Sequence, residues 1–482
     1  MNYRIVSYTV GRILQLEAAL FMFPLVVSLI YGEKNAALAF LISAAISLSA
    51  GLLLTYVIGK NDKLIFAREG FATVALTWIL MSAIGALPFV ISREIPSFTD
   101  AFFETVSGFT TTGGSILTDV EALSHGMLFW RSFTHWLGGM GVLVFIMAIL
   151  PQDTGRNIHI MRAEMPGPIV GKLVPKISDT AKILYLIYIG ITLVEVVLLL
   201  FGGMDLFESL VHAFGTAGTG GFGIKGDSLG SYNAYLQWVI TIFMLIFGIN
   251  FNLYYLMLIK QFKAAFKSTE LWIYIIIVIV SGAAITVNIL PMFGGALDEA
   301  VRHAFFQVAS IITTTGYSTV DFNLWPGFSK ALLFVIMFIG GCAGSTSGGI
   351  KVSRFIIAIK TVIKDIKQMI HPRSVACVKL DGKKVDDKTI NSVSVYFAFY
   401  FILFFIIFLL ISFEPFDFET NLTATAACFN NIGPGLAEVG PMGSFAAYSA
   451  PAKYLLSLAM LLGRLEIFPI LLLFTPSLWE KK

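Results

Sequence analysis

The chain contains long continuous blocks of apolar residues, and several blocks exceed the roughly 20 residues that a helix needs to cross a bilayer. Of its 482 residues, 57% are hydrophobic and only 13% are charged, whereas soluble domains carry about 25% charged residues. The blocks lack the alternation of apolar and polar residues that is typical of membrane β-barrels. The sequence therefore predicts an all-α integral membrane protein.

Ten segments are predicted to cross the membrane as helices: about 12–31, 35–59, 70–92, 128–151, 183–203, 234–259, 271–293, 328–350, 390–413 and 453–475. The first block follows basic residues as a signal peptide does, but it has no small-residue cleavage site and is interpreted as a retained helix. If the N-terminus is cytoplasmic, most of the 33 Lys and Arg residues fall in cytoplasmic segments, above all between Lys351 and Lys388. This asymmetry predicts that both termini face the cytoplasm.

Four connections between spans share one pattern, which aligns DAFFETVSGFTTTG, LFESLVHAFGTAGTG, RHAFFQVASIITTTG and NLTATAACFNNIG on Gly113, Gly220, Gly316 and Gly433. Acidic residues stand at or before the start of each stretch: Asp100, Asp205, Glu208, Asp298, Glu299, Asp417 and Glu419. Such residues suit the positive end of a helix. Because about ten helical residues rise only about 16 Å, half of a ~30 Å membrane core, we expect four short pore helices that enter the membrane and return.

Non-helical backbone is tolerated at membrane depth only where it is buried in protein or lines a water-filled cavity. The four loops are therefore expected to converge on one axis and to line a pore. Backbone carbonyls can replace the hydration shell of K⁺, the C-terminal ends of the short helices favour a cation, and these loops contain no Asp or Glu. The alternative, four ordinary Gly- and Thr-rich loops, does not explain why the pattern recurs between spans.

The loops TTTGGS (110–115), AGTGGFG (217–223), TTTGYS (313–318) and NNIGPG (430–435), with GGCAGSTSGGIKVSR (340–354), resemble the Trk/Ktr/HKT superfamily of potassium transporters. The chain is similar over nearly its whole length to the bacterial Trk-type membrane subunit. The resemblance implies a pseudo-fourfold arrangement of helix–pore helix–helix repeats after two leading helices. The implied boundaries are 1–69 for the leading pair and 70–155, 156–267, 268–388 and 389–482 for the four repeats.

The resemblance also implies a K⁺ selectivity filter, which carries over onto Thr111, Thr112, Gly113, Gly218, Thr219, Gly220, Thr314, Thr315, Gly316, Asn431, Ile432 and Gly433. In plant relatives a serine in place of the first filter glycine is associated with sodium preference. This chain has Gly113 there, which favours potassium. The fourth loop departs from the pattern because Ile432 lacks the threonine hydroxyl, which puts strict fourfold coordination in doubt.

A glycine-rich stretch late in the eighth span is predicted to interrupt the helix, since five of its ten residues are glycine. Its members are Gly340, Gly341, Cys342, Ala343, Gly344, Ser345, Thr346, Ser347, Gly348 and Gly349. The resemblance implies an intramembrane gating loop below the filter, while a helix kink without a gating role stays an alternative. A nucleotide-binding loop is disfavoured, because Ile350 separates Gly349 from Lys351 and a membrane span precedes the motif.

Arg464 lies about eleven residues into the last predicted span, where an arginine is costly and indicates a functional site. The resemblance implies that it faces the pore and forms the gate with the glycine-rich loop. The alternative is a structural ion pair, for instance with Glu195 of the fifth span. His125, His135, His212 and His303 are interpreted as packing or hydrogen-bonding residues.

The predicted function is K⁺ uptake across the cytoplasmic membrane, with K⁺ as the transported ion and no organic cofactor in the chain. The resemblance implies a homodimer on a cytosolic, nucleotide-binding, TrkA-like regulatory ring, for which the basic segment 351–388 offers a docking face. The net charge of +3 is too small to indicate nucleic-acid binding. The alternatives are a symporter that couples K⁺ to H⁺ or Na⁺, a non-transporting scaffold, and a membrane enzyme, for which no catalytic constellation is found.

Overall fold

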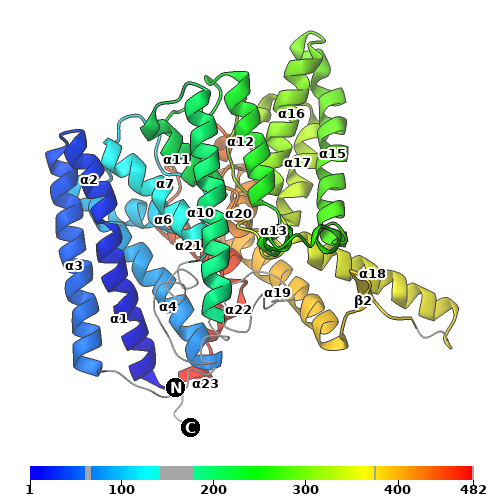
Figure 1. Cartoon of the computed structure of the whole chain (residues 1–482), viewed down its shortest axis with the longest axis horizontal. Helices are drawn as coiled ribbons and strands as arrows, with labels where there is room; N and C mark the ends of the chain where they lie inside the picture. Colours follow the sequence, from blue (N-terminus) through cyan, green and yellow to red (C-terminus); the bar gives the residue numbers. More distant parts are fainter. Residues whose placement is uncertain (60–66, 142–176, 374–375, 480–482) are drawn as a thin grey trace.

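The computed structural model describes residues 1–59, 67–141, 177–373 and 376–479, and these residues fold almost entirely into helices (Figure 1). Six helical segments among them are long and apolar enough to cross a bilayer: Tyr3–Ile30, Lys34–Val57, Arg68–Ser92, Thr180–Phe201, Thr269–Phe293 and Asp387–Ile411. They correspond to six of the ten predicted spans. The other four predicted spans correspond to the second helices of the repeats, whose course is described below.

The chain begins with a helical hairpin at one edge of the molecule, formed by α1 (Tyr3–Leu20), α2 (Met22–Ile30) and α3 (Lys34–Ile58) (Figure 1). Small residues let α1 and α3 approach closely, since a Cβ on Gly11 would lie 2.9 Å from the carbonyl oxygen of Gly51. Gln15 Nε2 donates to that same carbonyl at 3.1 Å. The two leading helices are therefore packed as one unit.

Four units of similar design follow the hairpin. The first contains α4 (Ala67–Gly85), α5 (Leu87–Ser92), α6 (Phe98–Phe109) and α7 (His125–Gly139). The second contains α10 (Ile177–Phe201), α11 (Leu206–Ala217), α12 (Ala234–Phe247), α13 (Phe251–Leu258) and α14 (Phe262–Ala265). The third contains α15 (Thr269–Ile289), η1 (Leu290–Phe293), α16 (Leu297–Ile312), η2 (Phe322–Leu324), α17 (Gly327–Ile339) and α18 (Val352–Ile370). The fourth contains α19 (Asp387–Ile411), α20 (Phe418–Asn430), η3 (Ala437–Val439), α21 (Ala450–Arg464), α22 (Phe468–Leu473) and α23 (Pro476–Trp479).

The short helices α6, α11, α16 and α20 are the predicted pore helices. Side-chain oxygens of Ser97, Asp205 and Asp417 accept hydrogen bonds from the first turns of α6, α11 and α20. Asp298 and Glu299 stand in the first turn of α16. The acidic residues that the sequence shows at or before these stretches therefore lie at the positive ends of the four helices.

The second helices of the second, third and fourth units do not run straight through. Helices α12 and α13 meet at an angle of 91°, α17 and α18 are separated by residues 340–351, and α21 and α22 by residues 465–467. Helix α7 ends at Gly139, and the rest of the predicted span 128–151 lies outside the described residues. The expectation of continuous helices at 234–259 and 453–475 is therefore wrong, because both segments break about halfway along.

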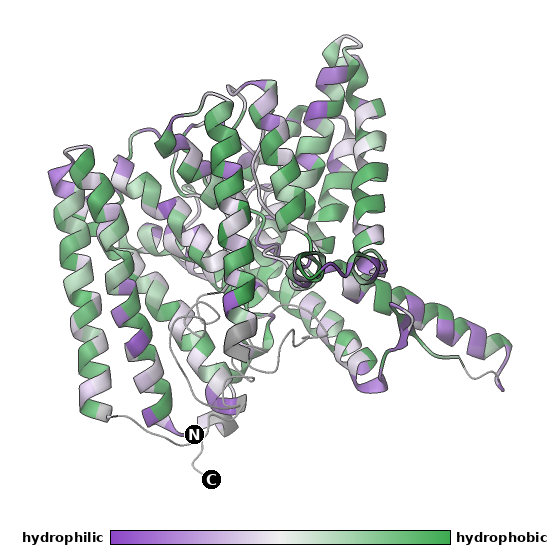
Figure 2. Cartoon of the chain, viewed as in Figure 1, coloured by the Kyte–Doolittle hydropathy of each residue, from purple (hydrophilic) through white to green (hydrophobic). Residues whose placement is uncertain are grey.

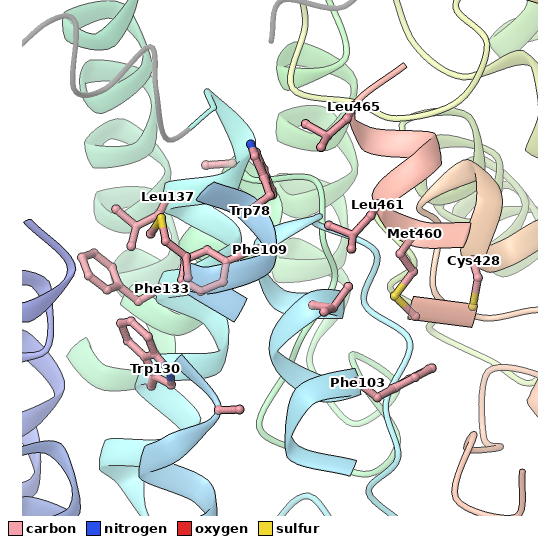
Figure 3. Close-up of a cluster of buried hydrophobic side chains, with 14 of the residues drawn as sticks. Trp78, Phe103, Phe109, Trp130, Phe133, Leu137, Cys428, Met460, Leu461 and Leu465 are labelled. Carbon is pink, nitrogen blue, oxygen red and sulfur yellow. The ribbon is translucent and has the colours of Figure 1, made fainter. Parts of the chain in front are cut away.

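The four units interlock in a ring. Each second helix packs against the pore helix of the next unit, in the pairs α7–α11, α12–α16, α17–α20 and α21–α6. The close-up in Figure 3 shows part of this core, where Phe103 and Phe109 of α6 lie between α7 and α21, near Met460 and Leu461. The packing of α21 onto α6 closes the ring from the fourth unit to the first.

The long helices consist largely of hydrophobic residues, as the colours of Figure 2 show. Exposed large hydrophobic residues are frequent on α3 and α19, where lipid is the compatible solvent. Helix α18 differs, because it extends away from the other helices and carries polar residues toward its end (Figures 1 and 2). A small antiparallel hairpin follows it, formed by β1 (Lys379–Leu380) and β2 (Lys383–Lys384).

Candidate functional site

The four pore helices end in the same backbone turn. In each loop one residue other than glycine has a positive φ of nearly the same value: Thr111 (54°), Thr219 (55°), Thr314 (57°) and Asn431 (57°). The amide that follows each of them reaches back five residues: Thr112 to Ser107, Gly220 to Gly215, Thr315 to Ser310 and Ile432 to Ala427. These repeated bonds fix the register in which the four loops correspond.

This register corrects the predicted alignment of the second loop by one residue. Two residues after Thr111 and its counterparts stands a glycine with positive φ: Gly113 (80°), Gly221 (79°), Gly316 (86°) and Gly433 (92°). In this register Thr219, Gly220 and Gly221 correspond to Thr111, Thr112 and Gly113 of the first loop. The sequence alignment instead chose Gly218, Thr219 and Gly220. Gly218 lies one residue before the turn, where its side-chain-bearing counterparts are Thr110, Thr313 and Asn430.

The glycines and the carbonyls of the four loops form a closed ring. A Cβ added to each glycine would lie less than 3.0 Å from a carbonyl oxygen of the next unit: Gly113 from Gly220, Gly221 from Thr315, Gly316 from Ile432 and Gly433 from Thr112. A side chain would thus displace the neighbouring backbone, in addition to the strain of a positive φ. The ring brings the four loops, distant in sequence, to one place.

A cavity of about 220 Å³ opens on one side of this ring, and Gly113, Gly221, Gly316 and Gly433 all line it. Arg131 and Lys225 also line it. Arg131 is buried and pairs with Glu104 at 2.8 Å, and Glu104 also accepts hydrogen bonds from Ser115 Oγ and the Ile116 amide at 3.0 Å. The charge of Arg131 is therefore neutralised within the first unit.

On the other side of the ring lies the glycine-rich loop. The Gly348 amide donates to Thr314 Oγ1 at 2.6 Å, so the loop touches the turn of the third pore helix directly. The loop also bonds to the break between α12 and α13, through Cys342 N to Gly248 O at 2.9 Å and Phe251 N to Gly344 O at 3.0 Å. The loop therefore spans from the third unit to the second, beneath the ring.

Arg464 closes the same region from the end of α21. Its guanidinium donates to Thr346 O of the loop at 2.8 Å, to Gly139 O at 2.7 Å and to Gly138 O. Gly138 and Gly139 end helix α7, so their carbonyls lie at the negative end of the helix dipole. One side chain thus joins the first, third and fourth units just below the ring.

Comparisons with known proteins identify the family of the chain. The family model TrkH, described as "Cation transport protein", matches residues 36–272 and 266–481. The chain belongs to the TrkH family. It is 36% identical to the Trk system potassium uptake protein TrkH of Escherichia coli K12 and 33% identical to that of Halomonas elongata, over the full length of both chains in each case. It also resembles the crystal structure of the potassium transporter TrkH from Vibrio parahaemolyticus, with a TM-score of 0.90, 32% identity and full coverage of both chains.

Family membership confirms several expectations. The chain is a multi-pass membrane protein with an all-α fold, as the apolar blocks predict. TrkH-family relatives are transport proteins, so the expectation of a transporter instead of an enzyme is also confirmed.

Sequence reasoning missed the residues that hold the glycine-rich loop in place. Glu270 at the start of α15 is buried, and its Oε1 accepts from the Ala343 amide at 2.8 Å and from the Ser353 amide at 2.9 Å. Lys351, also buried, donates through Nζ to Ser347 O within the loop. A buried acid or lysine beside a glycine-rich segment is a usable signal, but only spatial proximity links Glu270 to a loop some 70 residues away.

Glu466 has a partner that its sequence neighbours do not reveal. Its Oε2 lies 2.5 Å from Nη2 of Arg354, which stands in the first turn of α18, and the Arg354 guanidinium lies 3.9 Å from the Tyr396 ring centroid. Glu466 follows Arg464 by two residues, in the break between α21 and α22. The start of α18, which follows the glycine-rich loop, and the α21–α22 break, which follows Arg464, are therefore linked by an ion pair.

Proposed function

We propose that the chain takes up K⁺ through the ring of glycines and carbonyls that its four loops form. The observation that carries this proposal is the closure of the ring, in which each glycine lies against a carbonyl oxygen of the next unit. The curated relatives are named as potassium uptake proteins, which supports the choice of ion. Thr112, Gly220, Thr315 and Ile432 are the residues whose carbonyls contact the neighbouring glycines.

The chemistry of the loops favours a monovalent cation. Carbonyl oxygens supply partial negative charge without a fixed ion, and they can replace the water around K⁺. Residues 110–115, 217–223, 313–318 and 430–435 contain no Asp or Glu, so the ring offers no carboxylate to a divalent cation. The four pore helices point their C-terminal ends at the ring, which adds to the negative potential.

In this proposal the loop at residues 340–349 and Arg464 form the gate. A guanidinium beneath a cation filter raises an electrostatic barrier, and its bonds to Thr346 and Gly139 hold the loop across the path. Opening requires those bonds to break. The break between α17 and α18 gives the loop a hinge at Gly340, whose φ is 73°.

Location and partners follow from the same proposal. We place the protein in the cytoplasmic membrane with both termini inside, so that the membrane potential drives uptake by about 2.3 kcal/mol per charge per 100 mV. Helix α18 then projects toward the cytoplasm with its basic residues, such as Lys364 and Lys367. In this proposal the protein is a homodimer, and a cytosolic nucleotide-binding regulatory ring docks on α18. The first turn of α18 holds Arg354, the partner of Glu466, so a movement of the regulatory ring would act on the gate.

Flux into liposomes that contain the purified protein tests the proposal. We expect K⁺ to enter faster than Na⁺, Gly113→Ser to lower the K⁺/Na⁺ ratio, and Arg464→Ala to raise K⁺ flux without a partner. An unselective Arg464→Ala variant would contradict the separation of filter and gate. Uptake that follows an imposed pH or Na⁺ gradient would favour a coupled symporter instead of a channel-like pathway.

A further inference from the structure

The second loop lacks a side chain that the other three loops have. At the position whose carbonyl joins the ring stand Thr112, Thr315 and Ile432, which are all β-branched, but the second loop has Gly220. In the first and third loops this threonine is braced by a neighbour, since Thr110 and Thr313 bond to Thr112 and Thr315 through their hydroxyls at 2.8 Å. Gly220 has no side chain that a neighbour could hold in this way. Glycine is also the residue with the greatest backbone freedom, so its carbonyl needs another support.

The space beside Gly220 is filled by a residue of another unit. A Cβ on Gly220 would lie less than 3.0 Å from Cγ, Nδ1 and Cε1 of His135, which belongs to α7 of the first unit. A Cβ on Gly218 would meet the backbone of His135 just as closely. His135 therefore occupies the volume that a side chain on Gly218 or Gly220 would need.

His135 is itself held firmly. It is completely buried, and its Nδ1 lies 2.8 Å from the carbonyl oxygen of Gly108 in the first pore helix. Because a carbonyl only accepts, Nδ1 carries the proton. The imidazole also contacts the Phe222 ring, with the ring centroids 4.2 Å apart. The imidazole is thus fixed between the first pore helix and the second loop.

We propose that His135 replaces, from the neighbouring unit, the β-branched side chain that the second loop lacks, and so positions the Gly220 carbonyl in the ring. This inference rests on the proposed function, because it assigns His135 a part in ion selectivity. Its imidazole fills the space beside Gly220, and the Gly220 carbonyl is the one that Gly113 contacts. Without the imidazole, Gly220 and Gly221 gain backbone freedom, and one of the four carbonyls loses its fixed place. His135 acts as a positioning residue, since it supports the ring and contacts no ion.

The test compares K⁺ and Na⁺ flux in liposomes for four variants. His135→Ala removes all three ring atoms that face Gly220 and should lower the K⁺/Na⁺ ratio about tenfold, the equivalent of ~1.4 kcal/mol. Gly220→Val should abolish flux of both ions through its clash with the imidazole. The double variant His135→Ala/Gly220→Val restores a β-branched residue in the vacated volume and should recover K⁺ flux and most of the ratio. Gly221→Val with His135→Ala should stay inactive, because Gly221 faces the Thr315 carbonyl at a φ of 79°.

The outcomes separate this inference from the proposed function. A merely structural role of His135 lowers the amount of folded protein, which reduces both fluxes equally and leaves the ratio unchanged. An unchanged ratio in His135→Ala, or a double variant as inactive as Gly220→Val, would overturn the inference, and so would a double variant that fails to fold. Absence of K⁺-selective flux in the wild-type protein would instead refute the proposed function.

Discussion

Two glycines of the second loop, Gly221 and Gly223, differ in what a side chain would meet. A Cβ on Gly221 would lie less than 3.0 Å from the Thr315 carbonyl, and the backbone there has a φ of 79°. A Cβ on Gly223 has ordinary contact, 3.4 Å, with His212 Cε1 and no left-handed backbone. Of these two positions, only Gly221 therefore has to be glycine, and the reason is its contact with the ring.

We predict that Gly221→Ala lowers K⁺ flux at least about tenfold, because left-handed backbone costs alanine roughly 1–2 kcal/mol and the clash adds to it. The matched control, Gly223→Ala, should stay within about twofold of the wild type, since no strained contact arises. Tracer-ion flux per unit of folded protein in liposomes provides the measurement. Equal flux in the two variants would show that the register of the second loop is misassigned.

Sequence alone brings the right stretches together but leaves the register of single residues open. The loop AGTGGFG offers Gly220 and Gly221 as equally good partners for Gly113. The hydrogen bond from the Gly220 amide to Gly215 O and the positive φ of Thr219 and Gly221 decide between them. Arg464 is found from sequence because a charge within an apolar segment is conspicuous. Glu270 is not found, because its importance depends on two amides far along the chain.

Glu270 holds the glycine-rich loop between α17 and α18. One oxygen of Glu270 bonds to Ala343 near the start of the loop and to Ser353 in the first turn of α18. The two ends of the loop are thereby fixed to α15. A movement of α18 that opens the gate must pull against these charge-assisted hydrogen bonds, which are about twice as strong as neutral ones.

We predict that Glu270→Ala raises the K⁺ flux of the protein without a partner several-fold and leaves the K⁺/Na⁺ ratio unchanged. The reason is that two buried amides lose their acceptor, at a cost of about 1–3 kcal/mol each, which loosens the gate but not the ring. Glu270→Gln keeps an acceptor and should have a smaller effect. Glu299→Ala, an exposed acid in α16, serves as the control, and a lowered ion ratio in Glu270→Ala would argue against a pure gate role.

Helix breaks are predictable from sequence only where composition causes them. Residues 340–349 are rich in glycine and their break is expected. Residues 465–467, between α21 and α22, contain neither glycine nor proline, but Gly463 and Pro469 lie on either side of them. There Glu466 (φ 55°) and Ile467 (φ 69°) adopt left-handed backbone, and the hydrogen bond that Arg354 Nη2 donates to Glu466 Oε2 helps to hold the turn. Pro469, in the first turn of α22, cannot donate to a carbonyl four residues back and also favours the break, which the hydropathy of the segment alone does not reveal.

At the scale of the whole molecule, the ring of units is joined by ion pairs at two of its boundaries. Lys453 of α21 lies 2.6 Å from Asp100 of α6, which joins the fourth unit to the first. Lys330 of α17 lies 3.5 Å from Glu419 of α20, which joins the third unit to the fourth. The Lys453 side chain is 9% exposed and that of Lys330 is 28% exposed, so the two pairs differ in solvent screening.

We predict that Lys453→Ala destabilises the purified protein measurably and that Lys330→Ala has little effect. Removal of Lys453 leaves Asp100 without its charge partner where the first and last units meet, and a charge-assisted hydrogen bond is worth about 1.5–3 kcal/mol. An exposed pair such as Lys330–Glu419 is worth about 0–1 kcal/mol. The midpoint of thermal unfolding in detergent measures both. Equal shifts would mean that the boundary between the fourth and first units depends on the apolar packing of α21 against α6 and not on this ion pair, in which case Lys453→Met should match the wild type.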